Sequence, residues 1–188
     1  MSFTISLKRE SKWKFVTCSS MGASIGDGLA VGITSGSITL KDPAEKESEF
    51  RYGGVGAGLA AGIKLKLGKF NIEAPAASIP IAPSWFTSHG LVFVTSSCPG
   101  QELKRNDLSG PCAFVEIGLG AVVGYSEVGL LAGIQGPTGF WEKAVGAILP
   151  AAELYFAITS ARALILMRGW NAGAQLGGGG IAYLGFMS

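Results

Sequence analysis

Three short segments decide the fold: "GDGLAVG" at residues 26 to 32, "GAGLAAG" at 56 to 62 and "GLGAVVG" at 118 to 124. All three follow the spacing GxGxxxG. Three kinds of structure produce this spacing: a loop that binds phosphate, a pair of closely packed helices, and one face of a repeated strand. The residues that surround each copy distinguish between them.

A phosphate-binding loop requires a strand, a glycine-rich turn and a helix in one unit. The second copy is instead followed by "IKLKLGKFNIE", which alternates as a strand does. A P-loop would also place Lys and then Ser or Thr after its last glycine, and no copy does so. The motif therefore does not indicate nucleotide binding.

Packed helices in lipid also use glycines four residues apart. A membrane-spanning helix needs about 20 mostly apolar residues. Asp27 interrupts the first copy, Lys64 and Lys66 closely follow the second, and the third run contains Glu116 and Glu127. Each glycine would also cost about 1 kcal/mol within a helix. The helical interpretation is therefore disfavoured.

Counting by twos gives the period of a strand. In the second copy the odd positions from Val55 to Leu67 are all apolar, and the even positions from Gly54 to Gly62 are glycine or alanine. The third copy divides in the same way, and so does the first apart from Asp27. With a looser version near the carboxyl end, the pattern predicts four glycine-rich strand repeats, at about 21–40, 52–70, 113–134 and 163–186.

These repeats predict a single mainly β domain across residues 1–188, an antiparallel glycine-rich sheet that closes into a barrel or a sandwich. Near the amino terminus, "FTISL" and "KWKFVTC" predict an opening hairpin, and "GLVFVTS" predicts an interior strand. The segment "TGFWEKAVGAILP" has apolar residues at helical spacing and ends in proline. One covering helix is therefore expected near 139–149.

The glycine face raises the question of what covers it. Glycine weakens a strand unless something approaches that face closely, and a soluble sheet normally has a polar outer face. We therefore expect the glycine face to be covered by a helix of the chain, a second sheet, another subunit or a membrane. Only 15% of the residues are charged and 48% are hydrophobic, so few charges are available to coat a free surface.

Composition also limits the partners and the compartment. The formal net charge is only +2 and no segment concentrates Lys and Arg, so nucleic acid is not expected as a partner. Three cysteines favour buried thiols in a reducing compartment, although Cys98 and Cys112 bracket a polar loop that a disulfide would close. The amino terminus lacks the pattern of a secretory signal. A cytoplasmic location is the default expectation, with peripheral membrane association or signal-independent export as alternatives.

No residue pattern indicates an enzyme, a metal site or a cofactor. The single histidine, His89, has no nucleophile or metal-ligand spacing around it, so an ordinary loop position is expected. No G-x-S-x-G elbow occurs. Glu116 and Glu127 would form a carboxylate pair only if the fold brought them together. We therefore predict a non-catalytic protein without a cofactor.

Two local features favour a membrane surface. Lys64, Lys66 and Lys69 gather at one end of the second repeat, where each would gain about 1 kcal/mol on anionic lipid. Trp85 and Phe86 form an aromatic loop tip of the kind that enters a membrane interface. Solvated lysines and buried aromatic rings are the simpler interpretation. These five residues are the predicted lipid-binding or partner-binding site.

The segment "GYSEVGLLAGIQG", residues 124 to 136, resembles the glycine-rich strand segment of SYLF (Ysc84-like) lipid-binding domains, with its Tyr-Ser start and GLxAG end. The resemblance implies binding of phosphoinositides or other anionic lipids.

Together these features predict a domain that binds an anionic membrane surface or a protein partner through a glycine-rich apolar β surface. A second copy of the chain is one such partner, which would make a homo-oligomer. The first alternative is a β-barrel that binds a small apolar ligand. Another is an exported effector that inserts into a target membrane.

Overall fold

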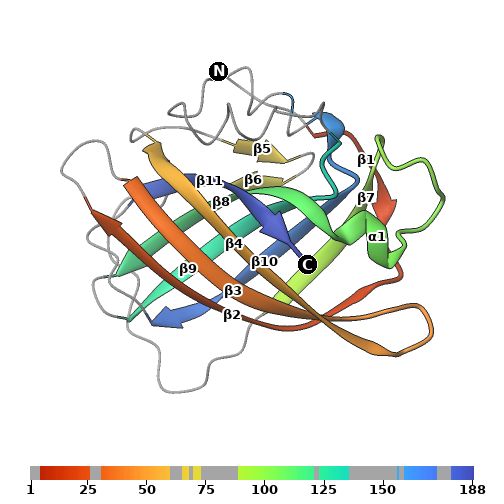
Figure 1. Cartoon of the computed structure of the whole chain (residues 1–188), viewed down its shortest axis with the longest axis horizontal. Helices are drawn as coiled ribbons and strands as arrows, with labels where there is room; N and C mark the ends of the chain where they lie inside the picture. The colour runs from red at the N-terminus through yellow and green to blue at the C-terminus, as the bar shows by residue number, and fades with distance from the viewer. Residues whose placement is uncertain are drawn as a thin grey trace.

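In the computed structural model, the described residues are 5–25, 31–59, 65–67, 70–72, 89–120, 123–135, 156, 159–172 and 179–188. They form a nine-stranded antiparallel sheet that curls into a half-barrel (Figure 1). The prediction of a mainly β, antiparallel architecture is confirmed. The helix expected near 139–149 lies outside the described residues.

The strands of the sheet are, in spatial order, β1 (Leu7–Glu10), β7 (His89–Thr95), β10 (Ala163–Ala172), β9 (Val123–Ala132), β8 (Gly110–Gly120), β11 (Gly179–Met187), β4 (Glu47–Leu59), β3 (Val31–Lys41) and β2 (Lys14–Ile25). A separate two-stranded ladder joins β5 (Leu65–Leu67) to β6 (Phe70–Ile72). The short helix α1 (Arg105–Leu108) lies beside one end of the half-barrel (Figure 1). This end is called the α1 end below.

The predicted repeats fall on consecutive strands. Residues 21–40 include the end of β2 and most of β3, and residues 52–70 include most of β4 and all of β5. The other two repeats fall on β8 with β9 and on β10 with β11. The segment "GLVFVTS" supplies most of β7, which lies between β1 and β10. The prediction of an interior strand there is confirmed.

The prediction of an opening hairpin is wrong. β1 pairs with β7, whereas β2 pairs with β3 at the other edge of the sheet. The chain leaves β7 at Ser11, whose amide donates to the Val92 carbonyl. Glu102 then accepts hydrogen bonds from the Ser11 hydroxyl and the Lys12 amide. The short polar link therefore makes a corner that is fixed by another segment of the chain, and not a turn that folds the two strands together.

Apolar side chains fill the inside of the half-barrel toward the α1 end. Fully buried examples from six segments are Ile38, Leu40, Phe50, Val92, Val94, Leu108, Leu130 and Ile165. Three aromatic rings lie further along the strands. Tyr52 meets Phe114 edge to face with 5.4 Å between ring centroids, and Phe114 stacks on Tyr183 at 4.8 Å. Such geometries add stabilisation beyond the buried area.

Glycines line the same inner side next to these rings. Gly36 is the ladder partner of Tyr52, and a β carbon at Gly36 would come within 2.6 Å of the tyrosine ring. Gly54 follows Tyr52 by two residues and shares its face, and a β carbon there would lie 2.5 Å from the Leu184 carbonyl oxygen. Neighbours therefore do approach the glycine face closely, as the strand interpretation requires.

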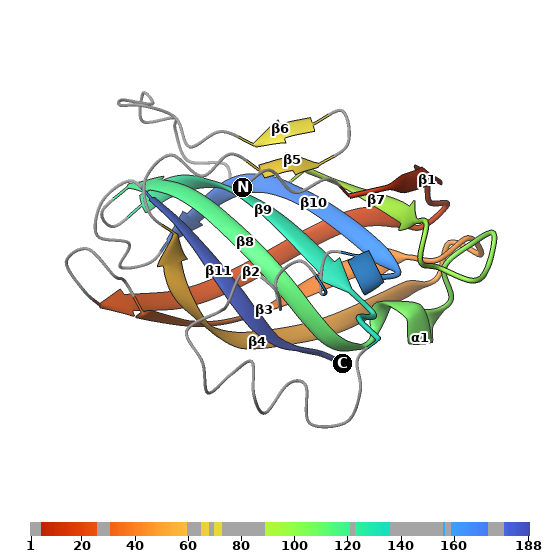
Figure 2. The ribbon, with the colours of Figure 1, turned by 90° about the horizontal axis from the view of Figure 1, so that it is seen from above.

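The two ends of the curled sheet meet where β2 passes β7. Backbone ladders join β7 to β1 and β10, and β2 to β3, but none of the described residues forms a ladder between β2 and β7. The ring of Phe15 instead lies against Gly90. Figure 2 shows the sheet curling so that β2 crosses near β7 and β10. The half-barrel is closed here by side-chain packing.

Candidate functional site

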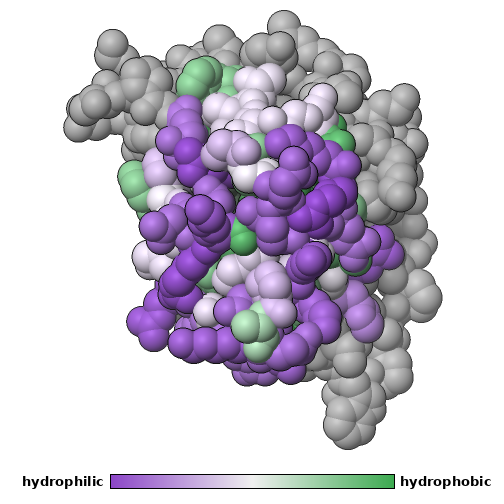
Figure 3. Space-filling view, turned by 90° about the vertical axis from the view of Figure 1, so that its right-hand side faces the viewer, coloured by the Kyte–Doolittle hydropathy of each residue, from purple (hydrophilic) through white to green (hydrophobic). Residues whose placement is uncertain are grey.

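The outer face of β3 and β4 changes from charged to apolar along the strands. Near the α1 end the ladder pairs Lys41 with Glu47, whose side chains form an ion pair of 3.6 Å. Four rungs further along the same face, Ile33 pairs with Val55. Figure 3, which views the α1 end, shows a predominantly hydrophilic surface there. Charged and polar side chains therefore cover much of this end of the described chain.

Ile33, Val55 and Phe186 form what we call the outer apolar patch. Their exposures are 62%, 41% and 58%, and they lie on the neighbouring strands β3, β4 and β11. Phe186 is the ladder partner of Gly53. Of the five large apolar side chains that are exposed in the described part of the chain, these three gather on adjacent strands. Contiguous apolar patches of this kind mark interaction sites, whereas scattered ones do not.

The outer apolar patch lies on the face of the sheet opposite to the glycines. Tyr52 belongs to the buried core and Gly54 lies on the same inner side, whereas Val55, the next residue of β4, is exposed. At these positions the glycine face is the inside of the half-barrel. The apolar residues that alternate with glycine are the ones that face outward.

The predicted site residues are mostly not placed by the structure. Lys64, Lys69, Trp85 and Phe86 lie outside the described residues. Lys66 is in β5, where its backbone pairs with Asn71 in the small ladder. The lipid-binding or partner-binding role of these five residues therefore stays a prediction.

Sequence reasoning missed the outer apolar patch because alternation defines two faces without saying which is inside. One signal was available. On a single face of β4, the residues change from Phe50 and Tyr52 to Gly54, and on the opposite face from Glu49 and Arg51 to Val55. Large residues give way to glycine on one face, which indicates that the space inside the sheet narrows along β4. Charged residues give way to an apolar one on the other face, which indicates that the outer surface becomes apolar in the same direction.

At the α1 end, Glu102 joins the loop before α1 to the start of β2. Its carboxylate accepts hydrogen bonds from Arg9 Nη2 at 2.7 Å, from the Ser11 hydroxyl, and from the amides of Lys12 and Leu103 at 3.0 and 2.9 Å. Burial alone would raise the pKa of Glu102, but these hydrogen bonds outweigh it and hold the pKa at about 2. So weak a base is suited to holding the loop and unsuited to accepting a proton near neutral pH.

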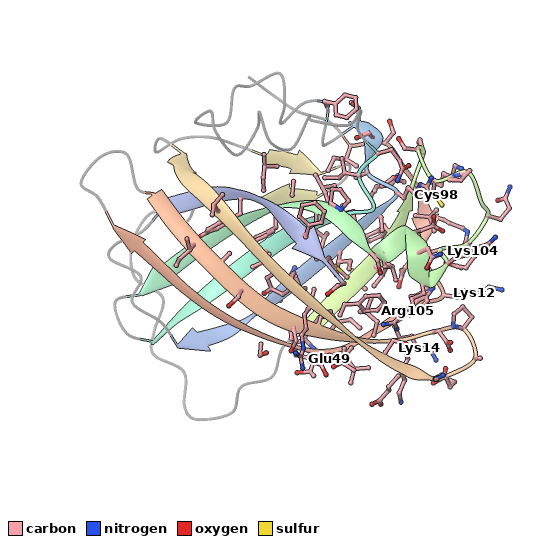
Figure 4. The ribbon with its side chains drawn as sticks, in the orientation of Figure 1. Lys12, Lys14, Glu49, Cys98, Lys104 and Arg105 are labelled. Carbon is pink, nitrogen blue, oxygen red and sulfur yellow. The ribbon has the colours of Figure 1, made fainter. Side chains whose placement is uncertain are left out.

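Basic side chains also lie at the α1 end, where Figure 4 labels Lys12, Lys14, Lys104 and Arg105. Lys12 and Lys104 are exposed, and the guanidinium of Arg105 lies 4.7 Å from the centroid of the Phe50 ring. A groove of about 470 Å³ lies between the start of β2, β7 and the β3–β4 turn. Its rim carries both signs of charge, from Glu10, Lys12, Lys14 and Glu45. The mixture does not select an ion of one sign.

The cysteines and the histidine considered as candidate chemical groups form no shared site among the described residues. Cys98 and Cys112 are buried free thiols, so the disulfide considered for them is not formed in this structure. Burial raises the pKa of the Cys112 thiol to about 12. His89 is the exposed first residue of β7 and not a loop residue. Among the described residues, no three His, Cys, Asp or Glu side chains gather as metal ligands would.

The two strand glutamates do not form a carboxylate pair. The ladder between β8 and β9 pairs position 116 with Val128 and position 127 with Ile117. Since alternate residues of a strand share a face, Glu116 and Glu127 occupy positions on opposite faces of the sheet. The arrangement that acid–base hydrolysis needs is therefore not made by these two residues.

Comparison with known proteins gives one informative result. The chain is similar to the toxin protein Tse4 of Pseudomonas aeruginosa, with 37% identity over 188 residues that cover 94% of this chain and 93% of that protein. No family model matches the chain, and no solved structure matches it. In the described part of the chain, none of the helices has both the length and the apolar character to cross a membrane.

Proposed function

We propose, since the chain belongs to the family of the toxin protein Tse4, that it is an exported toxin that acts without catalysis by binding lipid bilayers through the outer apolar patch. The observation that carries the proposal is the exposure of Ile33, Val55 and Phe186 on three neighbouring strands. A bilayer surface suits this patch because the patch is apolar, and because charged side chains of the described residues lie apart from it at the α1 end.

The magnitude of the effect indicates weak and reversible attachment by the patch alone. Transfer of a large apolar side chain out of water is worth about 1.5–3 kcal/mol when it is complete. The three side chains are only partly exposed, so together they contribute a few kcal/mol. Stable anchoring generally needs a second signal. Lys64, Lys66 and Lys69 would supply about 1 kcal/mol each on anionic lipid, and Trp85 with Phe86 would add an aromatic anchor.

The chemistry of the α1 end supports a mechanism without catalysis. The Glu102 carboxylate, which accepts four hydrogen bonds, is a very weak base, and the Cys112 thiol is protonated and buried. Both features favour structure over reactivity. Neither of these two described groups is an activated nucleophile, which supports action by occupying or perturbing a target, and a membrane is the target that the outer apolar patch favours.

Flotation with vesicles tests the proposal. Purified chain is mixed with vesicles of phosphatidylcholine and phosphatidylglycerol, and the bound fraction is measured after centrifugation. The variant I33S/V55S/F186S removes the outer apolar patch. The matched control V16S/L91S removes two exposed apolar side chains elsewhere, of 38% and 40% exposure.

We expect the wild-type chain and the control to float and the patch variant to bind at least about tenfold more weakly, since 1.4 kcal/mol corresponds to a tenfold change. Equal flotation of the patch variant and the wild type would overturn the proposal. Release of an enclosed dye separates membrane insertion from surface binding. Mass spectrometry of an organic extract tests the alternative of a bound small apolar ligand.

A further inference from the structure

The outer apolar patch belongs to a longer row of apolar residues on the outer face of the sheet. Ladder pairs join Ile33 to Val55, Val55 to Leu184, and Leu184 to Ala113. Partners that lie directly opposite in a ladder share a face of the sheet. Leu184 and Ala113 are each 2% exposed, whereas Val55 and Ile33 are 41% and 62% exposed. The row is therefore covered at Leu184 and open from Val55 onward, which sets one border of the exposed surface.

A second border crosses the strands on the side of the α1 end. On the outer face of β4, Val55 is followed toward that end by Gly53 and then by Arg51. The ladder partners of Gly53 and Arg51 on β3 are Ser35 and Ser37. From the patch toward the α1 end, Arg51 is therefore the first charged residue on either strand, and β3 presents hydroxyl groups beside it.

The backbone of Arg51 is fixed at this border while its side chain extends into solvent. Its amide donates to the Ser188 carbonyl at 2.8 Å, and its carbonyl accepts from the Ser188 amide at 2.9 Å. The side chain is 82% exposed and forms an ion pair of 3.6 Å with Glu49, whose own side chain is 54% exposed. Ion pairs between exposed side chains contribute little. A stronger acceptor can therefore take the place of Glu49.

The spacing along β4 matches the layers of a bilayer surface. Residues two apart in a strand are separated by about 7 Å, so Arg51 lies about that far from Gly53 and from the level of its ladder partner Phe186. An apolar face that binds a bilayer enters the boundary of headgroups and acyl chains to a depth of about 5–10 Å. With the Phe186 ring at this boundary, the Arg51 guanidinium would lie among the phosphate groups.

We propose that Arg51 binds the phosphate group of an anionic lipid when the outer apolar patch lies on a bilayer. The proposal rests on the proposed function and adds the lipid group that the same surface recognises. A guanidinium presents paired N–H donors that match two oxygens of a phosphate, and its methylene stem can lie along an apolar rim. The choline cation of phosphatidylcholine neutralises its phosphate, so the contact favours phosphatidylglycerol and other anionic lipids.

Arg51→Gln tests the proposal, and Lys14→Gln is its matched control. Each substitution removes one positive charge from an exposed side chain that pairs with a glutamate. Lys14 is the ladder partner of Lys41 at the α1 end, so the two variants have equal net charge and differ in their distance from the patch. Flotation at increasing lipid concentration measures partition of the full-length chain onto vesicles of phosphatidylcholine alone and of phosphatidylcholine with phosphatidylglycerol. Circular dichroism checks that each variant folds.

We expect Arg51→Gln to partition about fivefold more weakly than the wild type onto the vesicles with phosphatidylglycerol, the change that one basic residue makes at an anionic surface. On phosphatidylcholine alone it should match the wild type. Lys14→Gln should change much less on either vesicle, because salt screens charges that lie more than about 8 Å away.

The outcomes separate this proposal from the proposed function. If Arg51→Gln partitions as the wild type does, or if Lys14→Gln loses as much as Arg51→Gln, the assignment of Arg51 is overturned, whereas the patch is judged by I33S/V55S/F186S. A wild type that floats with neither vesicle would overturn both proposals.

Inorganic phosphate in place of chloride at equal ionic strength separates a lipid from a free anion as the ligand. We expect the wild type to stay on the vesicles with phosphatidylglycerol. Release to the level of Arg51→Gln would show that free phosphate occupies Arg51 without the bilayer, and would overturn the lipid assignment.

Discussion

The ring of Phe15 lies against Gly90 where β2 passes β7, so close that a β carbon at Gly90 would come within 2.5 Å of the ring. A β carbon there would also lie 3.0 Å from the Leu166 carbonyl oxygen, so the new methyl group has backbone on its other side. The substitution Gly90→Ala must therefore displace the ring or the strand. Overpacking of this kind typically costs about 1–3 kcal/mol, and we expect the urea midpoint of unfolding to fall accordingly.

Gly53→Ala is the matched control for this prediction. At Gly53 the nearest atoms to an added β carbon are at 3.5 and 3.8 Å, which is ordinary contact. Loss of backbone freedom in the unfolded chain even favours alanine by about 0.4–1 kcal/mol where the conformation allows it. If Gly90→Ala unfolds at the same urea concentration as Gly53→Ala, Phe15 does not close the junction between β2 and β7.

Glu102 makes stability depend on pH in acid. Hydrogen bonds lower its pKa from 4.5 to about 2 in the folded chain. A carboxyl group whose pKa is depressed by folding contributes stability that is fully present above 4.5 and is lost as the pH falls toward 2. We expect Glu102→Gln to lower the free energy of unfolding well above pH 4.5 and to differ much less from wild type near pH 2.

The size of this effect follows from hydrogen bonds to a charged group, each of which contributes about 1.5–3 kcal/mol net, less what the new amide recovers. Urea titrations at several pH values measure it. Glu45→Gln is the control, since Glu45 forms its ion pair with Lys14 and both side chains are more than half exposed. A difference between wild type and Glu102→Gln that is constant across this pH range would contradict the assignment.

The three cysteines should differ in reactivity. Burial raises the pKa of Cys112 to about 12, and Cys98 is 1% exposed, whereas Cys18 is only half-buried. Because the thiolate is the reactive form, buried thiols react slowly. A disulfide reagent that absorbs on release should label Cys18 first in the native chain and all three thiols in urea.

The variant Cys18→Ser provides the control for this labelling. In this variant the fast phase of labelling should disappear, and the number of thiols labelled in urea should fall from three to two. Rapid reaction of a second thiol in the native chain would show that the α1 end opens readily, contrary to the fixed role assigned to Glu102.

The strand architecture was predictable because glycine and apolar residues alternate with period two over long segments, and this period is local. Burial was not predictable in the same way. Whether Gly54 or Val55 faces inward depends on how β4, β11 and β3 curl together, and that curvature is set by contacts such as the approach of Leu184 to Gly54. The sequence therefore predicted the two faces and not which of them is outside.

The opening hairpin failed for a related reason. "KRES" looks like a turn between two strands when it is considered alone. Its Ser11 and the following Lys12 are held by Glu102, about 90 residues further along the chain. Propensity over a short window cannot include such a distant partner. The candidate surface was missed in the same way, because the separation of the charged and apolar ends appears only when the ladders are assembled.

Trp13 couples the corner at the start of β2 to the loop before α1. Its indole Nε1 donates to the Leu103 carbonyl at 2.8 Å, and its ring meets Phe50 edge to face with centroids 6.1 Å apart. The substitution Trp13→Phe keeps most of the apolar contact and removes the donor, which leaves a buried carbonyl unsatisfied. This should cost about 1–3 kcal/mol, whereas Trp13→Ala should cost about 3–5 kcal/mol.

Urea unfolding of the three chains measures this order, and vesicle flotation provides a second readout. The outer apolar patch lies on β3, β4 and β11, away from Trp13, so the folded Trp13→Phe variant should float as the wild type does. A Trp13→Phe variant with wild-type stability would show that the indole hydrogen bond contributes nothing. A folded Trp13→Phe variant that no longer floats would show that the α1 end takes part in binding lipid.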